Sequence, residues 1–575
     1  MASLRVWAPR PSSVEVEVDG TRTPLAQGGG GWWTGEVGGP GTDYALVLDG
    51  GDPRPDPRSA WQPHGVHGPS RVVDHDAFTW TDASWRGVAL PGSVLYELHV
   101  GTFTQQGTFD AAVGRLDHLV ELGVSAVELL PCNGFAGRWG WGYDGVAWFA
   151  VHEPYGGPDG LKRFVDACHA RGLGVVMDVV YNHLGPAGNY LPEFGPYLTE
   201  DHMTPWGPAV NLDRAGSDEV RRYVLDSALM WLRDYHVDGL RVDAVHAFVD
   251  ERATPLLEEL SVEVEALGAH LHKPLFLVAE SDVNDPRMVT AREAGGLGFH
   301  GQWADDVHHA LHANLTGENA GYYGDFMGLP VLAKVLSDVF LHDGRWSSFR
   351  QRTHGRPVPE TVPGHRFVVY LQGHDQIGNR ATGDRISATL SDGLLKIGAA
   401  LLLTSPFTPM LFMGEEWGAR TPWLFFSDHE GELDETVRKG RRAEFASHGW
   451  DTEQVPDPQD EATVRASTLD WDELAQDRHR SLLTWTRDLI ALRRARPELS
   501  DGHRDRTAVT YDEAQDWLVV RRGRVAVVVN LADERRTVPL TGSPQAVLLT
   551  SEPGVEHTDG RVTLAGESVA VVELA

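Results

Sequence analysis

Cysteine is nearly absent: the 575 residues include only Cys132 and Cys168. Two thiols cannot build a disulfide framework or a cysteine-rich zinc site. Basic residues are also scarce relative to acidic ones, because 50 Lys and Arg stand against 82 Asp and Glu, a formal net charge of −32. This charge repels phosphate backbones and anionic membranes, so nucleic acid and membrane surfaces are poor candidate partners. A neutral ligand is not repelled.

Long hydrophobic runs are missing as well. The first residues, MASLRVWAPRPSS, lack the apolar stretch of a secretory signal. The longest apolar segment, residues 394–413, is interrupted by a lysine and two prolines, which makes it unsuitable as a membrane span. We therefore expect a cytoplasmic protein. The content of 41% hydrophobic and 23% charged residues is typical of a globular chain with a sizeable core.

Both ends of the chain have the pattern of antiparallel β-structure. VEVEVDG and YALVLDG, near the start, alternate apolar and polar residues between Gly and Pro clusters. They predict an immunoglobulin-like β-sandwich over residues 1–88. DWLVVRRG, RVAVVVNLA and SVAVVELA predict a small β-sandwich over residues 501–575. Residues 453–477 are polar, and we expect mainly loops there.

Between these ends, residues 89–500 alternate short apolar strands with helical segments, which include residues 109–122 and 252–267. Near-continuous apolar strands are buried on both faces and indicate a parallel sheet. Eight strand–helix units predict an α/β fold, a (β/α)8 barrel with loop insertions. The eight strand candidates are SVLYELHV, SAVELLP, GVVMDVV, GLRVDAV, PLFLVAES, GFHGQWADD, FVVYLQ and PMLFMG.

Acidic residues follow several of these strands at the barrel end where such folds place catalysis. Arg241 and Asp243 lie two apart in GLRVDAVH, so they share a face, and the guanidinium can hold the carboxylate ionised. Glu280, in VAES, ends the neighbouring strand and could face Asp243 across a sugar. Two facing carboxyls cleave glycosides, one as nucleophile and one as acid, and Asp375 in GHDQIGNR could stabilise the charge that develops. Pairing with rim arginines would explain any one acid, but several together favour catalysis.

DVVYNH, GLRVDAVH, VAES and GHDQIGNR resemble the four signature regions of the α-amylase family of (β/α)8 glycoside hydrolases, in order along the barrel. The resemblance implies that Asp243 is the nucleophile, Glu280 the general acid/base and Asp375 the transition-state stabiliser. This chain has Gly373 where the family usually has Asn, which leaves the positioning of Asp375 open. The residues that the resemblance assigns to the −1 subsite are Tyr143, His183, Arg241 and His374, with His99 and Asp178 as supporting residues.

Three further segments resemble the branch of the family that hydrolyses the α-1,4 bond next to a terminal trehalose and releases trehalose. They are DAVHAF, GQWADDVHHALH and FMGEEWGARTPWLFFSDH. From them we expect substrate-binding roles for His246, Trp303, Glu416 and Trp423, with Trp417 and Phe426 as further candidate walls. Each aromatic residue could instead be core packing. Glu416, like Glu415, could be a solvated rim charge.

Two alternatives remain open: a glycogen branching enzyme, which transfers the cleaved chain to a sugar 6-hydroxyl, and an inactive glucan-binding protein, which would not need all three acids. The resemblance implies malto-oligosyltrehalose as substrate, trehalose as product, and a role in trehalose biosynthesis linked to the synthase that makes this substrate. We expect no cofactor and no metal, because the sequence shows no dense cluster of acidic ligands.

Overall fold

The computed structural model describes residues 2–447 and 455–575. Its centre is a closed barrel of eight parallel strands, so the predicted (β/α)8 barrel is confirmed. Each strand coincides with one of the eight predicted segments, except that β22 begins one residue before PMLFMG, at Thr408. Around the barrel the order is β9 (Leu95–Leu98), β10 (Ala126–Leu129), β13 (Gly174–Val179), β16 (Gly239–Val242), β17 (Phe276–Ala279), β18 (Gly301–Trp303), β21 (Phe367–Tyr370) and β22 (Thr408–Phe412).

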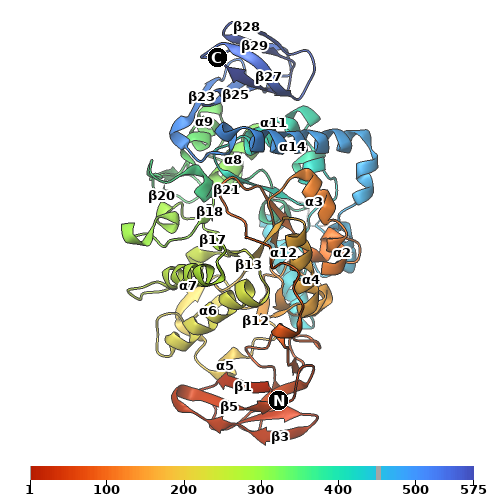
Figure 1. Ribbon diagram of the computed structural model, residues 1–575, viewed down its shortest axis with the longest axis vertical. Helices are drawn as coiled ribbons and strands as arrows, with labels where there is room; N and C mark the ends of the chain where they lie inside the picture. The colour runs from red at the N-terminus through yellow and green to blue at the C-terminus, as the bar shows by residue number, and fades with distance from the viewer. Residues whose placement is uncertain (1, 448–454) are drawn as a thin grey trace.

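Helices surround the barrel (Figure 1). The helix expected over residues 109–122 is divided at Gly114, a residue of low helix propensity, into α2 and α3. The helix expected from residue 252 begins after Pro255, whose backbone is extended. In the described part of the chain, no helix is both long enough and apolar enough to span a membrane. The principal helices are α2 (Phe109–Val113), α3 (Leu116–Leu122), α4 (Gly157–Ala170), α6 (Ser217–Asp234), α7 (Leu256–Leu271), α8 (Asp305–Thr316), α9 (Leu329–Asp338), α11 (Asp392–Leu403) and α14 (Asp477–Ala495).

The barrel interior has an apolar layer beneath a polar layer. Successive strand residues point to opposite faces, so residues two apart in a strand share the interior. The apolar cluster inside the barrel takes one residue each from β9, β10 and β13: Leu95, Ala126 and Val176. Two positions further along the same strands are Glu97, Glu128 and Asp178, all of them buried. Strand periodicity thus places acids at the carboxyl end of a hydrophobic core.

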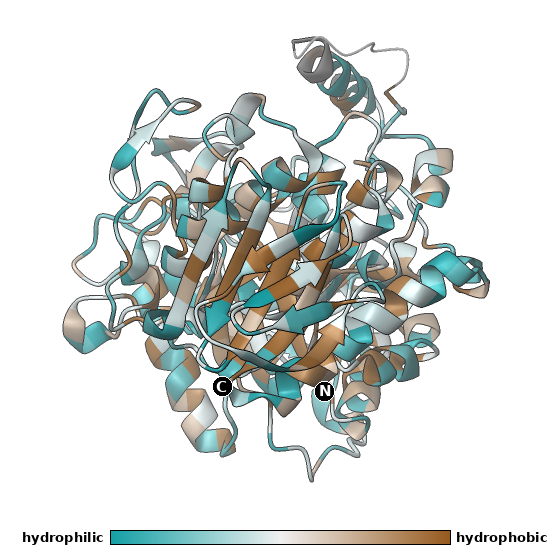
Figure 2. Cartoon of the chain, turned by 90° about the horizontal axis from the view of Figure 1, so that it is seen from above, coloured by the Kyte–Doolittle hydropathy of each residue, from teal (hydrophilic) through white to brown (hydrophobic). Residues whose placement is uncertain are grey.

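Antiparallel sheets lie at the two ends of the long axis (Figure 1). The predicted N-terminal and C-terminal β-domains are confirmed, whereas the immunoglobulin likeness and the boundaries at residues 88 and 500 stay predictions. Figure 2 looks onto the C-terminal strands, which are largely hydrophobic. The N-terminal sheets contain β1 (Ala2–Trp7), β5 (Trp32–Val37), β2 (Val14–Val18) and β6 (Asp43–Leu48), and the C-terminal sheet has at its centre β24 (Trp517–Arg522), β25 (Val525–Asn530) and β30 (Ser568–Leu574).

The polar segment 453–477 is more helical than expected. Residues 453 and 454 lie outside the described residues. The remainder contains α13 (Glu461–Ala466) and a 3-10 turn (Trp471–Ala475). Asp460 and Asp470 each accept a hydrogen bond from a backbone amide at the start of one of these elements, and such capping allows short helices in a polar sequence. The expectation of loops is wrong for these two elements, and the residues between and before them are loop.

Candidate active site

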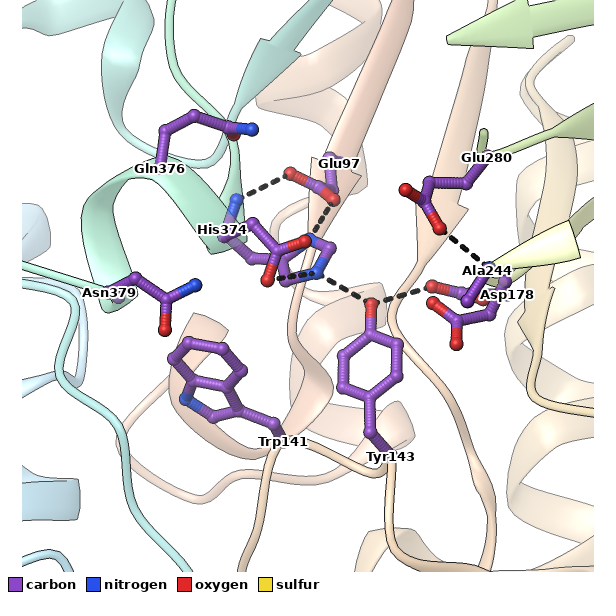
Figure 3. Close-up of polar contacts among 12 residues, drawn as sticks. Glu97, Trp141, Tyr143, Asp178, Ala244, Glu280, His374, Gln376 and Asn379 are labelled. Atoms are coloured by element: carbon purple, nitrogen blue, oxygen red, sulfur yellow. Dashed lines mark hydrogen bonds and ion pairs between the residues drawn. The ribbon is translucent and has the colours of Figure 1, made fainter. Parts of the chain in front are cut away.

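The carboxyl ends of β16 and β17 bring two acids together. The strands pair in parallel with Val242 opposite Ala279, so the next residues, Asp243 and Glu280, are neighbours at the rim. The backbone amide of Ala244 donates a 2.6 Å hydrogen bond to Oε2 of Glu280 (Figure 3). The structure therefore places the side chain of Glu280 against the residue that follows Asp243, as the strand order predicts.

Arg241 holds the Asp243 carboxylate in place. Its Nη1 donates to Oδ1 of Asp243 at 2.6 Å and to Oδ2 of Asp178 at 2.8 Å. The guanidinium lies over the ring of Trp303, with 4.3 Å between its central carbon and the ring centroid. Asn182 donates to the second oxygen of Asp243 at 3.2 Å. Both carboxylate oxygens are thus oriented by buried donors.

Burial gives the neighbouring acids unusual protonation. It raises the pKa of Glu280 to about 8; the positive charge of Arg241 opposes the rise, and nearby carboxylates led by Asp243 reinforce it. Glu280 therefore keeps its proton at neutral pH. Burial also raises the pKa of Asp178 to about 7, against the opposing effect of Arg241. Of the two neighbouring carboxyls at the rim, Asp243 is bound to the Arg241 cation and Glu280 is protonated.

A series of hydrogen bonds crosses the barrel mouth from Glu97 to Asp178 (Figure 3). Nδ1 of His374 lies 2.5 Å from Oε1 of Glu97, and its Nε2 lies 2.8 Å from the hydroxyl of Tyr143. That hydroxyl donates to Asp178 at 2.7 Å, and the tyrosine ring stacks on His374 with centroids 5.2 Å apart. Asp375, with its side chain 45% exposed, has Oδ1 3.6 Å from Nε2 of His374. These hydrogen bonds connect residues from four separate parts of the sequence.

His183 lies on the nucleophile side of the site. Its Nδ1 is 2.6 Å from Oδ1 of Asn182, and its ring stacks on Trp206 with centroids 4.5 Å apart. Trp206 is 49% exposed, at the turn between β14 (Leu198–Thr204) and β15 (Gly207–Val210). Nothing in the sequence pattern distinguishes Trp206 from the other 18 tryptophans, so only the fold reveals its position beside the site.

Several aromatic residues expected to line the substrate site are core residues instead, so these assignments are wrong. Trp423 is 0% exposed and stacks behind Trp141 with ring centroids 5.4 Å apart. Trp303 is 2% exposed and lies inside the barrel beneath Arg241. Fully buried rings have no surface to offer a sugar. The other two candidate walls are also fully buried: Trp417 and Phe426.

Glu416 is neither a sugar ligand nor a rim charge, so both expectations are wrong. Its side chain is 0% exposed; the hydroxyl of Tyr96 donates to its Oε1 at 3.0 Å, and Nε2 of His118 lies 2.8 Å from the same oxygen. These partners come from β9 and α3, so the glutamate joins the first and last strand–helix units. His246, by contrast, is exposed on the turn after Asp243, and its assignment stays a prediction.

The space beside Gly373 is already filled. The residue is extended (φ −147°, ψ 172°), a conformation open to any side chain. A Cβ there would lie 2.6 Å from Oε1 of Gln376 and 3.6 Å from Oε2 of Glu97. Both groups belong to the site in Figure 3. Where the family usually has an asparagine side chain, this chain places the side chains of Gln376 and Glu97.

Within the described ranges, one group of side chains has the proximity needed to hold a metal ion. Ligand atoms of His202, Asp213 and Glu251 all lie within 4.8 Å of one another. A guanidinium already pairs with both carboxylates, because Nη1 of Arg214 lies 3.0 Å from Glu251 and 3.5 Å from Asp213. Inspection of the sequence does not reveal this group, because its three members come from separate segments. That the protein needs no metal stays a prediction.

A cavity of about 320 Å³ adjoins Asp375. Its lining includes Asp282, two residues beyond Glu280, and Asp305, whose charge helps raise the pKa of Glu280. Two aromatic residues of the lining, Tyr322 and Phe349, are 38% and 55% exposed. The cavity therefore combines hydrogen-bond acceptors with exposed aromatic rings on the Glu280 side of the site.

Comparison with known proteins identifies the family. An "Alpha amylase, catalytic domain" model matches residues 73–197, and a "Domain of unknown function (DUF3459)" model matches residues 502–571. The malto-oligosyltrehalose trehalohydrolase of Arthrobacter ramosus is 54% identical over 576 residues, which cover 99% of both chains. This chain belongs to the malto-oligosyltrehalose trehalohydrolase family.

Two further matches compare this trehalohydrolase-family chain with other members of the α-amylase family. It superposes on the crystal structure of a putative alpha amylase from Salmonella typhimurium with a TM-score of 0.91 and 37% identity, over all of this chain and 97% of the other. A 1,4-alpha-glucan branching enzyme of Xanthomonas campestris is 27% identical, over 75% of this chain and 61% of that enzyme. The resemblance to the α-amylase family is confirmed, and the trehalohydrolases are nearer than this branching enzyme.

Replacing Trp423 with alanine in this trehalohydrolase-family protein should destabilise the fold. The substitution leaves a cavity in the core and should lower the free energy of unfolding by about 3–5 kcal/mol. Chemical denaturation measures the change. Trp346, which is 58% exposed, provides the matched control, and its replacement with alanine should change stability by about 0.5 kcal/mol or less. Equal effects of the two substitutions would contradict the buried position of Trp423.

Proposed function

We propose that this chain hydrolyses the α-1,4-glucosidic bond next to the terminal trehalose of malto-oligosyltrehalose and releases trehalose. The observation that carries the proposal is the pair of neighbouring carboxyls: Asp243 bound to Arg241, and Glu280 with its pKa raised to about 8. Such a pair provides a nucleophile and an acid at one glycosidic bond. The name of the Arthrobacter ramosus relative supports this choice of substrate.

In the first step, a carboxylate oxygen of Asp243 attacks the anomeric carbon of the glucose in the −1 subsite. The bond from that carbon to the bridging oxygen breaks while Glu280 gives its proton to this oxygen, and trehalose leaves. The sugar remains attached to Asp243 as an ester. Asp375, exposed beside the cavity, stabilises the positive charge that the ring acquires.

In the second step, Glu280 is a carboxylate and accepts a proton from water. The water oxygen attacks the anomeric carbon from the side that trehalose left, and the bond to Asp243 breaks. Two inversions retain the anomeric configuration. A retaining mechanism also predicts a separation of about 5–5.5 Å between the two carboxyl groups.

We infer that Tyr143 and His183 line the −1 subsite, and that His374 and Asn182, both almost fully buried, hold them in position. Asn182 contacts both Asp243 and His183, so the nucleophile and this histidine share one support. The ring of Tyr143 stacks on His374. Arg241 lies beneath the subsite, where it binds Asp178 and Asp243. His246, exposed on the turn after Asp243, extends the subsite toward the rim.

We assign the trehalose leaving group to the cavity beside Asp375. Glu280 protonates the leaving oxygen, so the departing disaccharide must lie on the Glu280 side, where Asp282 and Asp305 line the cavity. Carboxylates accept hydrogen bonds from sugar hydroxyls. The exposed rings of Tyr322 and Phe349 offer flat apolar faces for the pyranose rings.

We further infer a role in trehalose biosynthesis in the cytoplasm, with a malto-oligosyltrehalose synthase supplying the substrate. The name of the Arthrobacter ramosus relative supports the pathway. The two cysteines, Cys132 and Cys168, are both free and buried, which suits a reducing compartment.

Product analysis tests the proposed reaction. With malto-oligosyltrehalose the protein should release trehalose, with the new reducing end formed in the α configuration, as NMR at early times would show. Asp243→Asn should lower kcat by about a thousandfold or more while leaving the circular dichroism spectrum unchanged, because the exchange is nearly isosteric. New branches in long amylose would assign the chain to glucan transfer instead, and binding without turnover would make it a glucan-binding protein.

The pH dependence of kcat/KM should follow Glu280. Its acid form is needed to protonate the leaving oxygen, and this form is present below its pKa of about 8. Activity should therefore fall as pH rises through about 8, by about tenfold for each further pH unit. Glucosides with an activated aryl leaving group need no such proton, so kcat/KM for these substrates should not fall at alkaline pH. An unchanged decline with these substrates would contradict the acid role.

Phe349 should affect substrate preference. Phe349→Ala removes an exposed ring of the cavity and should lower kcat/KM for malto-oligosyltrehalose by about tenfold more than for a malto-oligosaccharide of equal length. Trp346→Ala is the matched control, because this exposed ring is near in sequence but is not part of the cavity lining. Parallel losses on both substrates would place the trehalose elsewhere.

A further inference from the structure

Glu97 is a buried carboxylate that contacts one residue of the site at two points. It lies in β9 inside the barrel and is 1% exposed. Its Oε1 lies 2.5 Å from Nδ1 of His374, and its Oε2 accepts a 3.1 Å hydrogen bond from the backbone amide of the same residue. No step of the proposed reaction uses Glu97. These contacts fix both the imidazole ring and the start of α10 (His374–Gly378).

The surrounding charges make His374 a cation. Burial alone would lower its pKa, but the carboxylates of Glu97 and Asp375 outweigh burial and the opposing charge of Arg241, and they raise the pKa to about 9. Burial lowers the pKa of His99 to about 3 and raises that of Glu128 well above its usual range, so both are uncharged at neutral pH. The remaining titratable groups that face His374 are Tyr143 and Asp178.

An imidazolium ring gives the hydrogen-bond chain a single direction. Nδ1 of His374 donates to the carboxylate described above, so Nε2 must donate to the hydroxyl of Tyr143, 2.8 Å away. The hydroxyl proton is then directed to Asp178 at 2.7 Å (Figure 3). Asp178 also accepts from Arg241, which binds Asp243. A continuous series of contacts thus connects β9 with the proposed nucleophile.

We propose that Glu97 is a positioning residue for the reaction: it holds His374 as an imidazolium and thereby fixes the direction of the hydrogen bonds through Tyr143 to Asp178. The proposal rests on the proposed function. Without the negative charge of Glu97, a neutral His374 can accept at Nε2, and Tyr143 can turn its proton away from Asp178. Asp178 then loses a donor that stabilises its carboxylate, so its contact with Arg241 weakens. The guanidinium that binds Asp243 is then no longer fixed from that side, which loosens the nucleophile.

The pH dependence of Glu97→Gln tests this role. Glutamine keeps the size of the side chain but removes the charge. When its carbonyl oxygen accepts from Nδ1, a neutral His374 has no proton on Nε2 to donate to Tyr143. At pH 8 the variant should lose about 10–100-fold in kcat on malto-oligosyltrehalose, by analogy with residues that orient metal-binding histidines. At pH 5.5 acid restores the imidazolium, so the ratio of variant to wild-type kcat should recover to within a few fold. Loss of packing alone would lower the ratio equally at every pH.

Glu128→Gln provides a matched control. Glu128 lies opposite Glu97 on the adjacent strand β10, is equally buried at 1% exposure, and is uncharged. Its variant should show a ratio that does not change with pH. Glu97→Asp retains the charge at a shorter reach and should lower kcat by a factor that is also independent of pH. A flat ratio for Glu97→Gln, or the same pH dependence in Glu128→Gln, would overturn the proposal.

A measurement on the unmodified protein covers the case in which Glu97→Gln does not fold. Carbon-13 NMR of histidine-labelled protein, with the His374 signal assigned from its absence in His374→Asn, should show His374 protonated up to a midpoint near pH 9. A midpoint at or below the ordinary histidine value of about 6.5 would overturn the proposal. Failure of wild-type protein to cleave malto-oligosyltrehalose would instead refute the proposed function and leave this titration informative.

Discussion

The buried guanidinium of Arg241 is the interaction on which the barrel mouth depends. It rests on Trp303 inside the barrel and binds Asp178 and Asp243 with the same nitrogen. Removing one partner of such a buried ion pair leaves an uncompensated charge and costs about 3–5 kcal/mol. The orientation of the proposed nucleophile is therefore coupled to the folding of the barrel, because the same contact serves both.

The position of the acids could be predicted because it follows from two local regularities. Strand periodicity places Arg241 and Asp243 on one face, and parallel pairing brings Glu280 to the same rim. The role of Trp303 could not be predicted in this way. Whether a strand residue faces the interior or the helices depends on how the barrel closes, and here closure places the ring beneath Arg241.

Partners that are distant in sequence explain the wrong assignments. Glutamates are mostly exposed, so the acids of FMGEEWG resemble surface residues. Glu416 is buried because β22 closes against β9, which brings Tyr96 to it from 320 residues away. The contact between Glu97 and His374 arises in the same closed barrel across 277 residues. Sequence periodicity identifies the strands but carries little information about which side chains meet once the barrel is closed.

The excess of acidic residues has a specific effect at the site, on the protonation of Glu280. The two neighbouring carboxyls have the same chemistry, and only their surroundings separate them: Asp243 is bound to a cation, whereas Glu280 is half-buried near acids that include Asp305 and Asp375. Loss of solvation is the largest cause of the raised pKa of Glu280, and these carboxylates add to it. A sugar carries no charge, so they do this without repelling the proposed substrate. The acidic residues around the cavity thus act together with Glu280, since their charges help to keep it protonated at a pH where an exposed glutamate would be ionised.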